Sequence, residues 1–316
     1  MSETFDSNDT NFIPENKEYT KCAPSKKYTD GSCFTIGSLQ KIAEAHNRFF
    51  GGDSDKLIKI SESKKDLVTE LTNRISKCGT DQLCWLDINW VKQIKDYDIH
   101  NNTFRPKGPQ GRFKWLSTTN INDIMGQYEQ KYVDFKFLGA VPIDFEDLPP
   151  LGISDLDFDQ LFNSGKKKIG LVINLDEHWK KGSHWVSMFA NLENNNIYYF
   201  DSYGIKPRNK ITEFVKKIAL WCYKRNKLGI QYGSSKDKEL NDTESNFMRA
   251  KKNKYEEQMN ISYNKIRHQF KNSECGVYSV NFILRLLKGE LFDNICSNIT
   301  TDDQVNECRK VYFRFK

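Results

Sequence analysis

One cysteine of the chain stands where a thiol can become a nucleophile. Cys275 follows a polar segment, residues 271–274, and opens an apolar stretch, residues 275–287, that has the spacing of a helix. A thiol at a helix N-terminus faces the positive end of the helix dipole, which favours the thiolate. Gly276 allows a tight turn beside it. A buried structural cysteine could occupy the same position, so catalysis requires partner residues.

A histidine and an aspartate are placed to serve such a nucleophile. His184 opens an alternating segment, residues 184–192, that is typical of a strand, and Asp201 ends the next strand along the chain. If a hairpin joins the two strands, both residues lie at the same edge of a sheet. A thiol nucleophile needs a base, and a carboxylate can orient that base. We therefore predict that His184 is the base and that Asp201 orients its ring.

A fourth group has the chemistry of an oxyanion donor. Gln269 lies six positions before Cys275, in a short segment, residues 264–270, that we expect to be a strand. Its side-chain amide could reach the same point as the backbone N–H of Cys275, where the oxyanion of an acyl-transfer reaction would form. The chain therefore offers a base, an orienting carboxylate, an oxyanion donor and a nucleophile, in that order.

These groups together resemble a known family. The motifs His184-Trp185, Asp201 and Gln269-x5-Cys275-Gly276 are similar to the signature of the ubiquitin-like-protein-specific cysteine proteases, which are the SUMO-deconjugating peptidases. Adenovirus-type proteases are similar in the order of their catalytic groups. The resemblance implies the same four roles in catalysis for His184, Asp201, Gln269 and Cys275.

The resemblance also implies a substrate-binding pair of tryptophans. Trp115-Leu116 resembles the Trp-Leu-Asn-Asp motif at the start of the family's catalytic domain, although Ser117-Thr118 stands where Asn-Asp would be. Trp115 and Trp185 would then close over a Gly-Gly segment of the substrate. A tunnel between flat indoles admits only residues that lack a Cβ atom, which is a physical reason for such a preference. Burial of Trp185 in the core is the alternative for that residue.

The resemblance extends over roughly residues 113–316, and its local sequences resemble the proteases that mature core or capsid polyproteins in mimivirus- and asfarvirus-like viruses. It implies an α+β fold, a papain-type core of the SUMO-protease and adenain kind with an extra N-terminal helical region. The implied function is a thiol endopeptidase that cleaves after Gly-Gly-type motifs in viral structural precursors, without a cofactor or metal. Its partner would be a viral polyprotein or a ubiquitin-like precursor, in the virion or in the viral factory of the host cytoplasm.

Two other functions stay open at this point. One is deconjugation of host ubiquitin-like proteins by the same site. The other is a non-enzymatic virion protein that binds nucleic acid, suggested by a net charge of +6 and by an expected helix pair near residues 36–78. The net positive charge would also allow a protease to contact DNA weakly. The alternative is that the short lysine runs are ordinary solvent-exposed surface.

Other residues compete weakly for the same chemistry. A second His-Trp pair, His178-Trp179, lies in the polar loop before His184, where we expect a solvated histidine. His268 is expected on the opposite face of its strand from Gln269. Two cysteines, Cys78 and Cys84, could bind a metal ion with His100, but the spacing fits metal sites poorly.

The elements that must position the site follow from hydrophobic spacing. A strand that runs into a loop is expected at residues 135–145, and further strands at 169–175, 184–192 and 197–204. Helices are expected at 39–49, 63–78, 121–128, 211–222 and 275–287. We divide the chain into a flexible N-terminus, residues 1–21, a helical region with its linker, residues 22–112, and a catalytic domain, residues 113–316. A charged insert is expected at residues 233–262.

Length and composition set the remaining expectations. The 316 residues are enough for one large domain or two modest ones, and no apolar run approaches the length of a membrane helix. The N-terminal sequence lacks the features of a signal peptide. Eight cysteines are present, and in a reducing compartment we expect all of them to be free thiols.

Overall fold

The computed structural model describes residues 21–111, 113–228 and 259–314. The chain divides into two compact units. Unit 1 comprises Met1–Gly108, Gly126–Lys131 and Glu307–Lys316, and unit 2 comprises Pro109–Met125 and Tyr132–Asn306. Almost all of the expected N-terminal segment, residues 1–21, and most of the expected insert, residues 233–262, lie outside the described residues.

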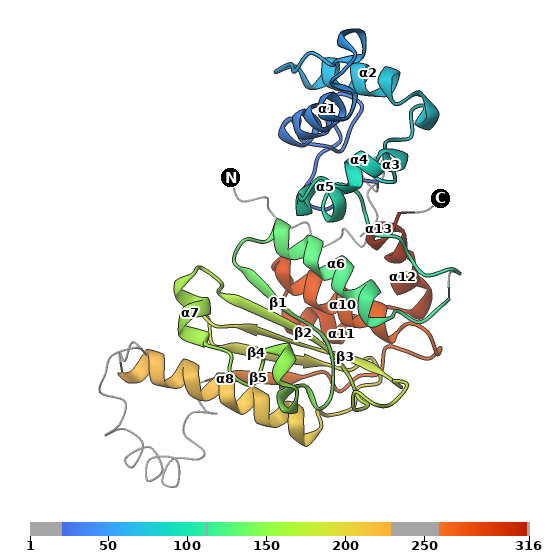
Figure 1. Ribbon diagram of the computed structural model, residues 1–316. Coiled ribbons are helices and arrows are strands. Elements are labelled where there is room, and N and C mark those ends of the chain that lie inside the picture. The colour runs from blue at the N-terminus through green and yellow to red at the C-terminus, as the bar shows by residue number, and fades with distance from the viewer. Residues whose placement is uncertain (1–20, 112, 229–258, 315–316) are drawn as a thin grey trace. The chain divides into compact units, whose positions relative to one another are not determined.

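Unit 2 contains a five-stranded sheet with the order β1-β2-β3-β4-β5 (Figure 1). The strands are β1 Phe135–Pro142, β2 Lys168–Asn174, β3 Trp185–Asn191, β4 Asn196–Phe200 and β5 Asn260–Tyr263. β3 is antiparallel to both β2 and β4, whereas β1 and β5 add to the edges as parallel strands. The predicted hairpin is confirmed, because β3 and β4 pair from Ser187 with Phe200 to Asn191 with Asn196.

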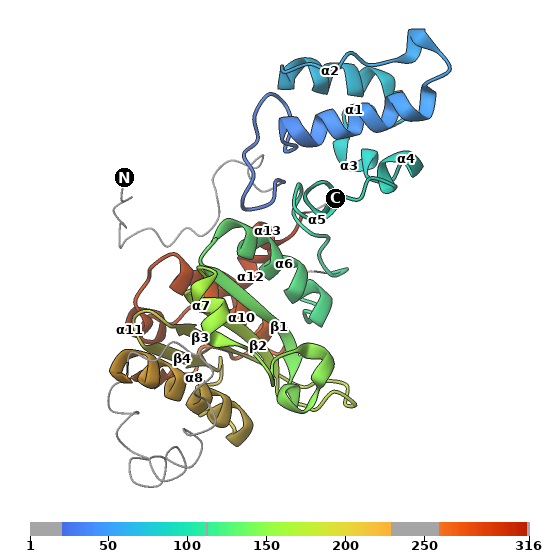
Figure 2. The same ribbon diagram turned by 60° about the vertical axis from the view of Figure 1, so that its left-hand side comes forward.

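Helices cover both faces of this sheet (Figures 1 and 2). The helix α8, Asn209–Leu228, shares one apolar core with alternate residues of the strands, among them Ile169, Leu171, Val186, Met188, Phe214 and Ile218. The helix α10, Cys275–Leu287, covers the other face, where a Cβ atom on Gly170 would lie 3.3 Å from Ile283. Every residue of α10 is buried. The α+β class is therefore confirmed, and Cys275 begins a helix that the sheet holds in place.

The segment before the nucleophile differs from the prediction. Residues 264–270 form no strand, and the fifth strand ends just before them, at Tyr263. The backbone groups of this segment make hydrogen bonds outside any strand ladder. The Asn264 side chain donates to the carbonyl of Ile266, and the N–H groups of His268 and Gln269 both donate to the carbonyl of Ser202. The predicted strand was wrong because short polar side chains can replace ladder hydrogen bonds.

Shorter elements complete unit 2. They are α7 Phe158–Asn163, α11 Phe292–Ser297, α12 Asp302–Glu307 and the 3-10 turns η3 Phe145–Asp147 and η4 Pro149–Leu151. The helix α6, Thr118–Lys131, carries residues of both units. Its position agrees with the helix expected at residues 121–128.

Unit 1 is helical. Its elements are α1 Ile36–Phe50, η1 Ser54–Lys56, α2 Lys64–Arg74, η2 Ser76–Cys78, α3 Gln82–Trp85, α4 Asn89–Lys92, α5 Tyr97–Asn101 and α13 Arg309–Tyr312. The helix predicted to begin at Ser63 is confirmed, since the Ser63 hydroxyl accepts from the N–H of Asp66 at 3.3 Å and caps α2. Phe34 and Trp85 are fully buried in the centre of this unit and stack on each other.

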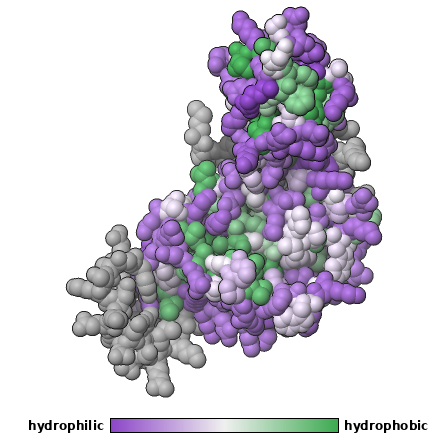
Figure 3. Space-filling model, in the orientation of Figure 1, coloured by the Kyte–Doolittle hydropathy of each residue, from purple (hydrophilic) through white to green (hydrophobic). Residues whose placement is uncertain are grey.

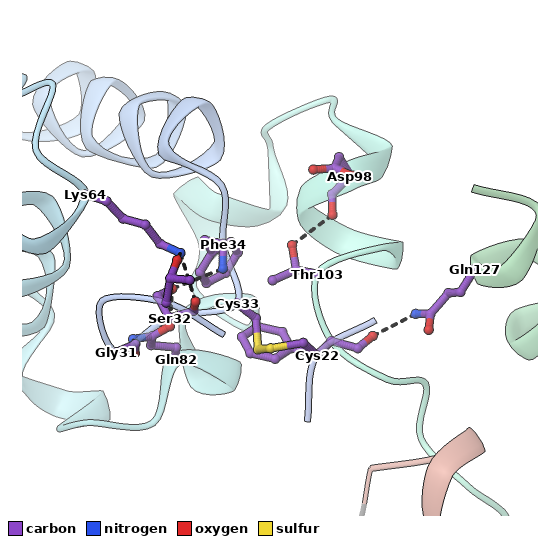
Figure 4. Close-up of a disulfide and its surroundings, with 12 residues drawn as sticks. Cys22, Gly31, Ser32, Cys33, Phe34, Lys64, Gln82, Asp98, Thr103 and Gln127 are labelled. Carbon is purple, nitrogen blue, oxygen red and sulfur yellow. Dashed lines mark hydrogen bonds between the residues drawn. A yellow bond between two sulfur atoms is a disulfide. The ribbon is translucent and has the colours of Figure 1, made fainter. Parts of the chain in front are cut away.

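Two disulfides in unit 1 correct the expectation of eight free thiols. Cys22 bonds to Cys33 (Figure 4), and Cys78 bonds to Cys84. Their Cα atoms are 5.3 and 5.5 Å apart, within the range that a disulfide spans. The metal hypothesis for Cys78, Cys84 and His100 is wrong for the same reason, because both thiols are already bonded. Amino-acid composition does not indicate which cysteines lie within bonding distance, because that distance depends on the folded chain.

The disulfides predict a defined pattern of thiol reactivity. Alkylation of the denatured protein without a reductant should modify the four free cysteines, Cys222, Cys275, Cys296 and Cys308, and spare the other four. Peptide mapping by mass spectrometry should then recover one linked pair that contains Cys22 with Cys33 and one that contains Cys78 with Cys84. Alkylation of all eight in freshly purified, unreduced protein would contradict the pairing.

No helix in the described parts of the chain is long and apolar enough to cross a membrane. The face drawn in Figure 3 is mainly hydrophilic, with smaller apolar patches between the charged side chains. The surface chemistry on that face therefore agrees with the high content of charged residues, 28% of the sequence.

Candidate active site

The edge of the β3-β4 hairpin brings the predicted base and carboxylate together. His184 directly precedes β3, and Asp201 directly follows β4. His184 Nε2 lies 2.7 Å from Asp201 Oδ1, and only 8% of His184 and 1% of Asp201 are exposed. Antiparallel pairing produces this contact, because the start of one strand lies beside the end of the next. The predicted neighbourhood of the two residues is confirmed.

Two further groups hold Asp201 in place, and the sequence analysis missed them. Asn264 makes two hydrogen bonds with the backbone of Asp201, accepting from its N–H at 2.8 Å and donating to its carbonyl at 2.7 Å. The N–H of Tyr203 donates to Asp201 Oδ1 at 2.8 Å. Asp201 Oδ1 thus receives a backbone donor as well as the imidazole. The contact between the Asp201 side chain and the N–H of Tyr203, two residues on, is a local Asx-type turn that sequence can indicate. The contact with Asn264 cannot be predicted in this way, because 63 positions separate Asn264 from Asp201.

The nucleophile candidate begins α10. Cys275 is 2% exposed, and no side chain caps this helix at Glu274. The first N–H groups of a helix have no acceptor within it, so they remain available to a ligand. Glu274 instead turns its carboxylate to Ser273 and Asn306, whose side-chain nitrogen donates to it at 2.8 Å. The first N–H groups of α10 are therefore left without a side-chain cap next to Cys275.

The His184 imidazole is more basic than an ordinary histidine. Burial by itself would lower its pKa, but hydrogen bonds to Asp201 and Cys275 and the charges of both groups outweigh this effect and raise the pKa to about 9. His184 therefore carries a positive charge at neutral pH. The proton on this imidazole is available to a leaving group.

This raised pKa predicts an alkaline limit to activity. Above about pH 9 the imidazole loses the proton that a leaving amine needs, so kcat/KM should fall there. Asp201→Asn removes the main partner that raises the pKa, so the alkaline limb should move down by about one to three pH units. Asp144→Asn is the matched control, because Asp144 forms a similar pair with His178. An unchanged limb in Asp201→Asn would contradict the assignment.

Gln269 is fixed beside this pair by its own hydrogen bonds. Its Oε1 accepts from the hydroxyl of Ser202 at 2.6 Å, and its Nε2 donates to the carbonyl of Lys271 at 2.7 Å. Gln269 is fully buried, and its backbone N–H donates to the carbonyl of Ser202 at 2.9 Å. Within the described residues, its second side-chain N–H has no partner. The amide therefore presents one oriented donor, as the predicted oxyanion role requires.

The two tryptophans are joined through Leu116. Trp185 is 5% exposed, and its indole N–H donates to the carbonyl of Leu116 at 3.0 Å. Trp115, the preceding residue, is 47% exposed. A Cβ atom on Gly276 would lie 3.1 Å from Leu116 and 3.3 Å from Trp185, so this glycine is needed for the close approach beside Cys275. The Trp185 indole is thus held beside the nucleophile, and Trp115 precedes Leu116 in the chain with its side chain open to solvent.

The competing residues have other partners. His178 forms a pair with Asp144, with Nδ1 2.6 Å from Oδ2, and its side chain is half exposed. His268 is buried and contacts the carbonyl of Cys296, and burial lowers its pKa. His100 contacts the carbonyl of Ile94. Among the described residues, no group of three or more possible ligands could hold a metal ion.

Comparison with known proteins gives one family. Residues 165–313 match the C-terminal catalytic domain of the Ulp1 protease family. A thiol protease of Acanthamoeba polyphaga mimivirus is 36% identical over 93% of this chain and 93% of its own. A SUMO-1 cysteine protease of African swine fever virus is 22% identical over 79% of this chain and 90% of its own. The crystal structure of an African swine fever virus protease shares the fold, with a TM-score of 0.58 at 18% identity, covering 94% of this chain and 97% of its own.

Proposed function

Since the chain belongs to the Ulp1 protease family and is a cysteine protease, we propose that it is an endopeptidase that cleaves after Gly-Gly-type motifs in viral structural precursors during virion maturation. The observation that carries this proposal is the contact of His184 with Asp201 at the edge of the sheet, beside the buried start of α10. A thiol, an imidazole and a carboxylate in this order are the requirements for nucleophilic acyl transfer.

The proposed reaction has two stages. The Cys275 thiolate attacks the carbonyl carbon of the glycine, and the Cys275 N–H and the Gln269 amide stabilise the oxyanion. His184 then gives its proton to the leaving amine as the C–N bond breaks, which leaves a thioester. In the second stage His184 takes a proton from water as the water oxygen attacks the thioester carbon. The C–S bond then breaks and releases the Cys275 thiolate, and the glycine carboxylic acid that departs gives its proton to the solvent.

The packing around Gly276 supports a substrate with small residues. Leu116 and Trp185 both lie against this glycine, and Trp115 adjoins Leu116 in the chain. A substrate segment that passes between the two indoles toward Cys275 meets flat apolar walls. Residues without a Cβ atom fit such a passage with the least displacement. This supports glycine at the two positions before the scissile bond.

A peptide series tests the proposal. Peptides that contain Gly-Gly-X, Gly-Ala-X or Ala-Ala-X are incubated with the full chain, and the products are identified by mass spectrometry. We expect cleavage after Gly-Gly and at least a roughly 100-fold lower kcat/KM for Ala-Ala, because each added methyl must displace a wall of the passage. A viral structural precursor and a SUMO fusion are compared in parallel. Faster cleavage of the SUMO fusion would favour deconjugation of ubiquitin-like proteins over precursor processing.

The disulfides bear on where the protein acts. Disulfides are rare in the reducing cytoplasm and persist in more oxidising surroundings. We propose that the protein reaches the virion from the viral factory in the host cytoplasm and that unit 1 carries its disulfides in the particle. Thiol labelling of opened virions without a reductant would test this: labelled Cys22 and Cys78 would contradict it.

A further inference from the structure

An exposed arginine lies one aromatic ring away from the proposed base. The ring of Tyr203 stacks on the imidazole of His184, with centroids 4.5 Å apart and planes inclined by 10°. The guanidinium of Arg267 lies 5.0 Å from the centroid of Tyr203, on a ring that already touches the base. The ring of Phe270 also lies near the guanidinium, with its centroid 4.9 Å away. Arg267 therefore contacts two aromatic rings, one of which stacks on the proposed base.

Hydrogen bonds fix the loop that carries this arginine. Nε of Arg267 donates to the carbonyl of Gln269 at 2.6 Å. The N–H groups of Phe270 and Lys271 both donate to Asp302 Oδ2, at 2.9 and 3.0 Å. Asp302 is buried, so its carboxylate acts as an internal brace for the loop. These hydrogen bonds fix the position of the Arg267 guanidinium.

The charge of Arg267 is not balanced by a partner in the described parts of the chain, where it forms no ion pair with a carboxylate. The neighbouring Lys271 differs, because it pairs with Asp303 at 2.6 Å. A guanidinium has five N–H donors, and within the described residues only the one on Nε donates a hydrogen bond. Arg267 is exposed, and so is Phe270, at 68%. The remaining donors therefore belong to an exposed guanidinium that lies one aromatic ring away from the proposed base.

We propose that Arg267 is a specificity-determining residue that binds an acidic side chain of the substrate, on the leaving-group side of the scissile bond. The proposal rests on the proposed protease function of the same site. Planar guanidinium donors match a carboxylate in two parallel hydrogen bonds. The leaving amine must pass His184 to receive its proton. Tyr203 stacks on His184 and Arg267 lies over Tyr203, whereas Trp185 and Leu116 lie at Gly276. An extended peptide advances about 3.3 Å per residue, so Arg267 is in reach of the first residues after the bond.

Matched peptides test this inference. Two Gly-Gly-X series carry Glu or Gln at the first, second or third position after the scissile bond. We expect the wild type to prefer Glu by about tenfold in kcat/KM at one of these positions, because a charge-assisted bidentate pair replaces a neutral contact. Arg267→Gln should reduce this ratio to about one while it still cleaves the Gln peptide. Arg267→Glu should prefer a Lys peptide over the Glu peptide.

Lys265→Gln is the matched control, because Lys265 is an exposed cation of the same loop that lies over Tyr263. It should keep the preference for Glu. Equal cleavage of Glu and Gln peptides by the wild type, or an unchanged preference in Arg267→Gln, would overturn the inference.

A second measurement separates this inference from the protease proposal. Cys275 is alkylated with iodoacetate, which is anionic, and with iodoacetamide, which is neutral. If Arg267 attracts a carboxylate to this site, the ratio of the two rates should fall by about fivefold in Arg267→Gln and stay unchanged in Lys265→Gln. Failure of every peptide to be cleaved by the wild type would count against the proposed function. An unchanged alkylation ratio in Arg267→Gln would count against Arg267 alone.

Discussion

Cys275→Ala should abolish cleavage of a Gly-Gly peptide, with a loss in kcat of about 10,000-fold or more. The substitution removes the one atom that can form the thioester, and no neighbouring group can replace it. The helix should persist, because Cys275 is the first residue of α10 and alanine favours helices. Initial rates with excess peptide measure the loss, and circular dichroism checks the fold.

Cys296→Ala is the matched control for this result. Cys296 is another free cysteine of unit 2, but burial raises the pKa of its thiol to about 12, so it stays protonated at neutral pH. Its backbone carbonyl, which contacts His268, is kept in the variant. Activity of Cys296→Ala should stay within about twofold of wild type. Equal rates for Cys275→Ala and the wild type would remove Cys275 from the mechanism.

His184→Ala should lower kcat/KM by about 1,000-fold or more. The variant loses both the cation that stabilises the thiolate and the acid that protonates the leaving amine. It also leaves Asp201 buried without its imidazole partner, so the loss of activity must be compared with the loss of stability in a thermal melt. A folded His184→Ala that cleaves at the wild-type rate would contradict the proposed mechanism.

The second His-Trp pair supplies the control. His178 also precedes a tryptophan and also contacts an aspartate, at 2.6 Å, but its side chain is half exposed in the loop between β2 and β3. His178→Ala should therefore change kcat/KM by less than about twofold. The two variants differ only in which His-carboxylate pair is broken. A larger loss of kcat/KM in His178→Ala than in His184→Ala would indicate that His178 and Asp144 form the active site instead.

Much of the site could be predicted from sequence because its signals are local. The alternating residues of β3 and β4 are close in the chain, so a hairpin between His184 and Asp201 follows from short-range pairing. The apolar spacing after Cys275 predicts a helix that begins at that residue, as α10 does. The segment 264–270 was misjudged because its apolar residues suggest a strand, whereas its backbone is held by Asn264 and Ser202. Those contacts depend on chain segments that are distant in sequence.

Local patterns in the chain predict the order of the four candidate groups, the helix that carries Cys275 and the hairpin that joins His184 to Asp201. These features depend on periodicity and on neighbours within a few tens of residues. The side chains that brace the site and the cysteines that pair follow from the folded chain, because Asn264 meets Asp201, and Asp302 meets the loop of Phe270, from distant positions in the sequence. The stack of His184, Tyr203 and Arg267 belongs to this second class: three short segments must converge before a lone surface arginine becomes a neighbour of the base.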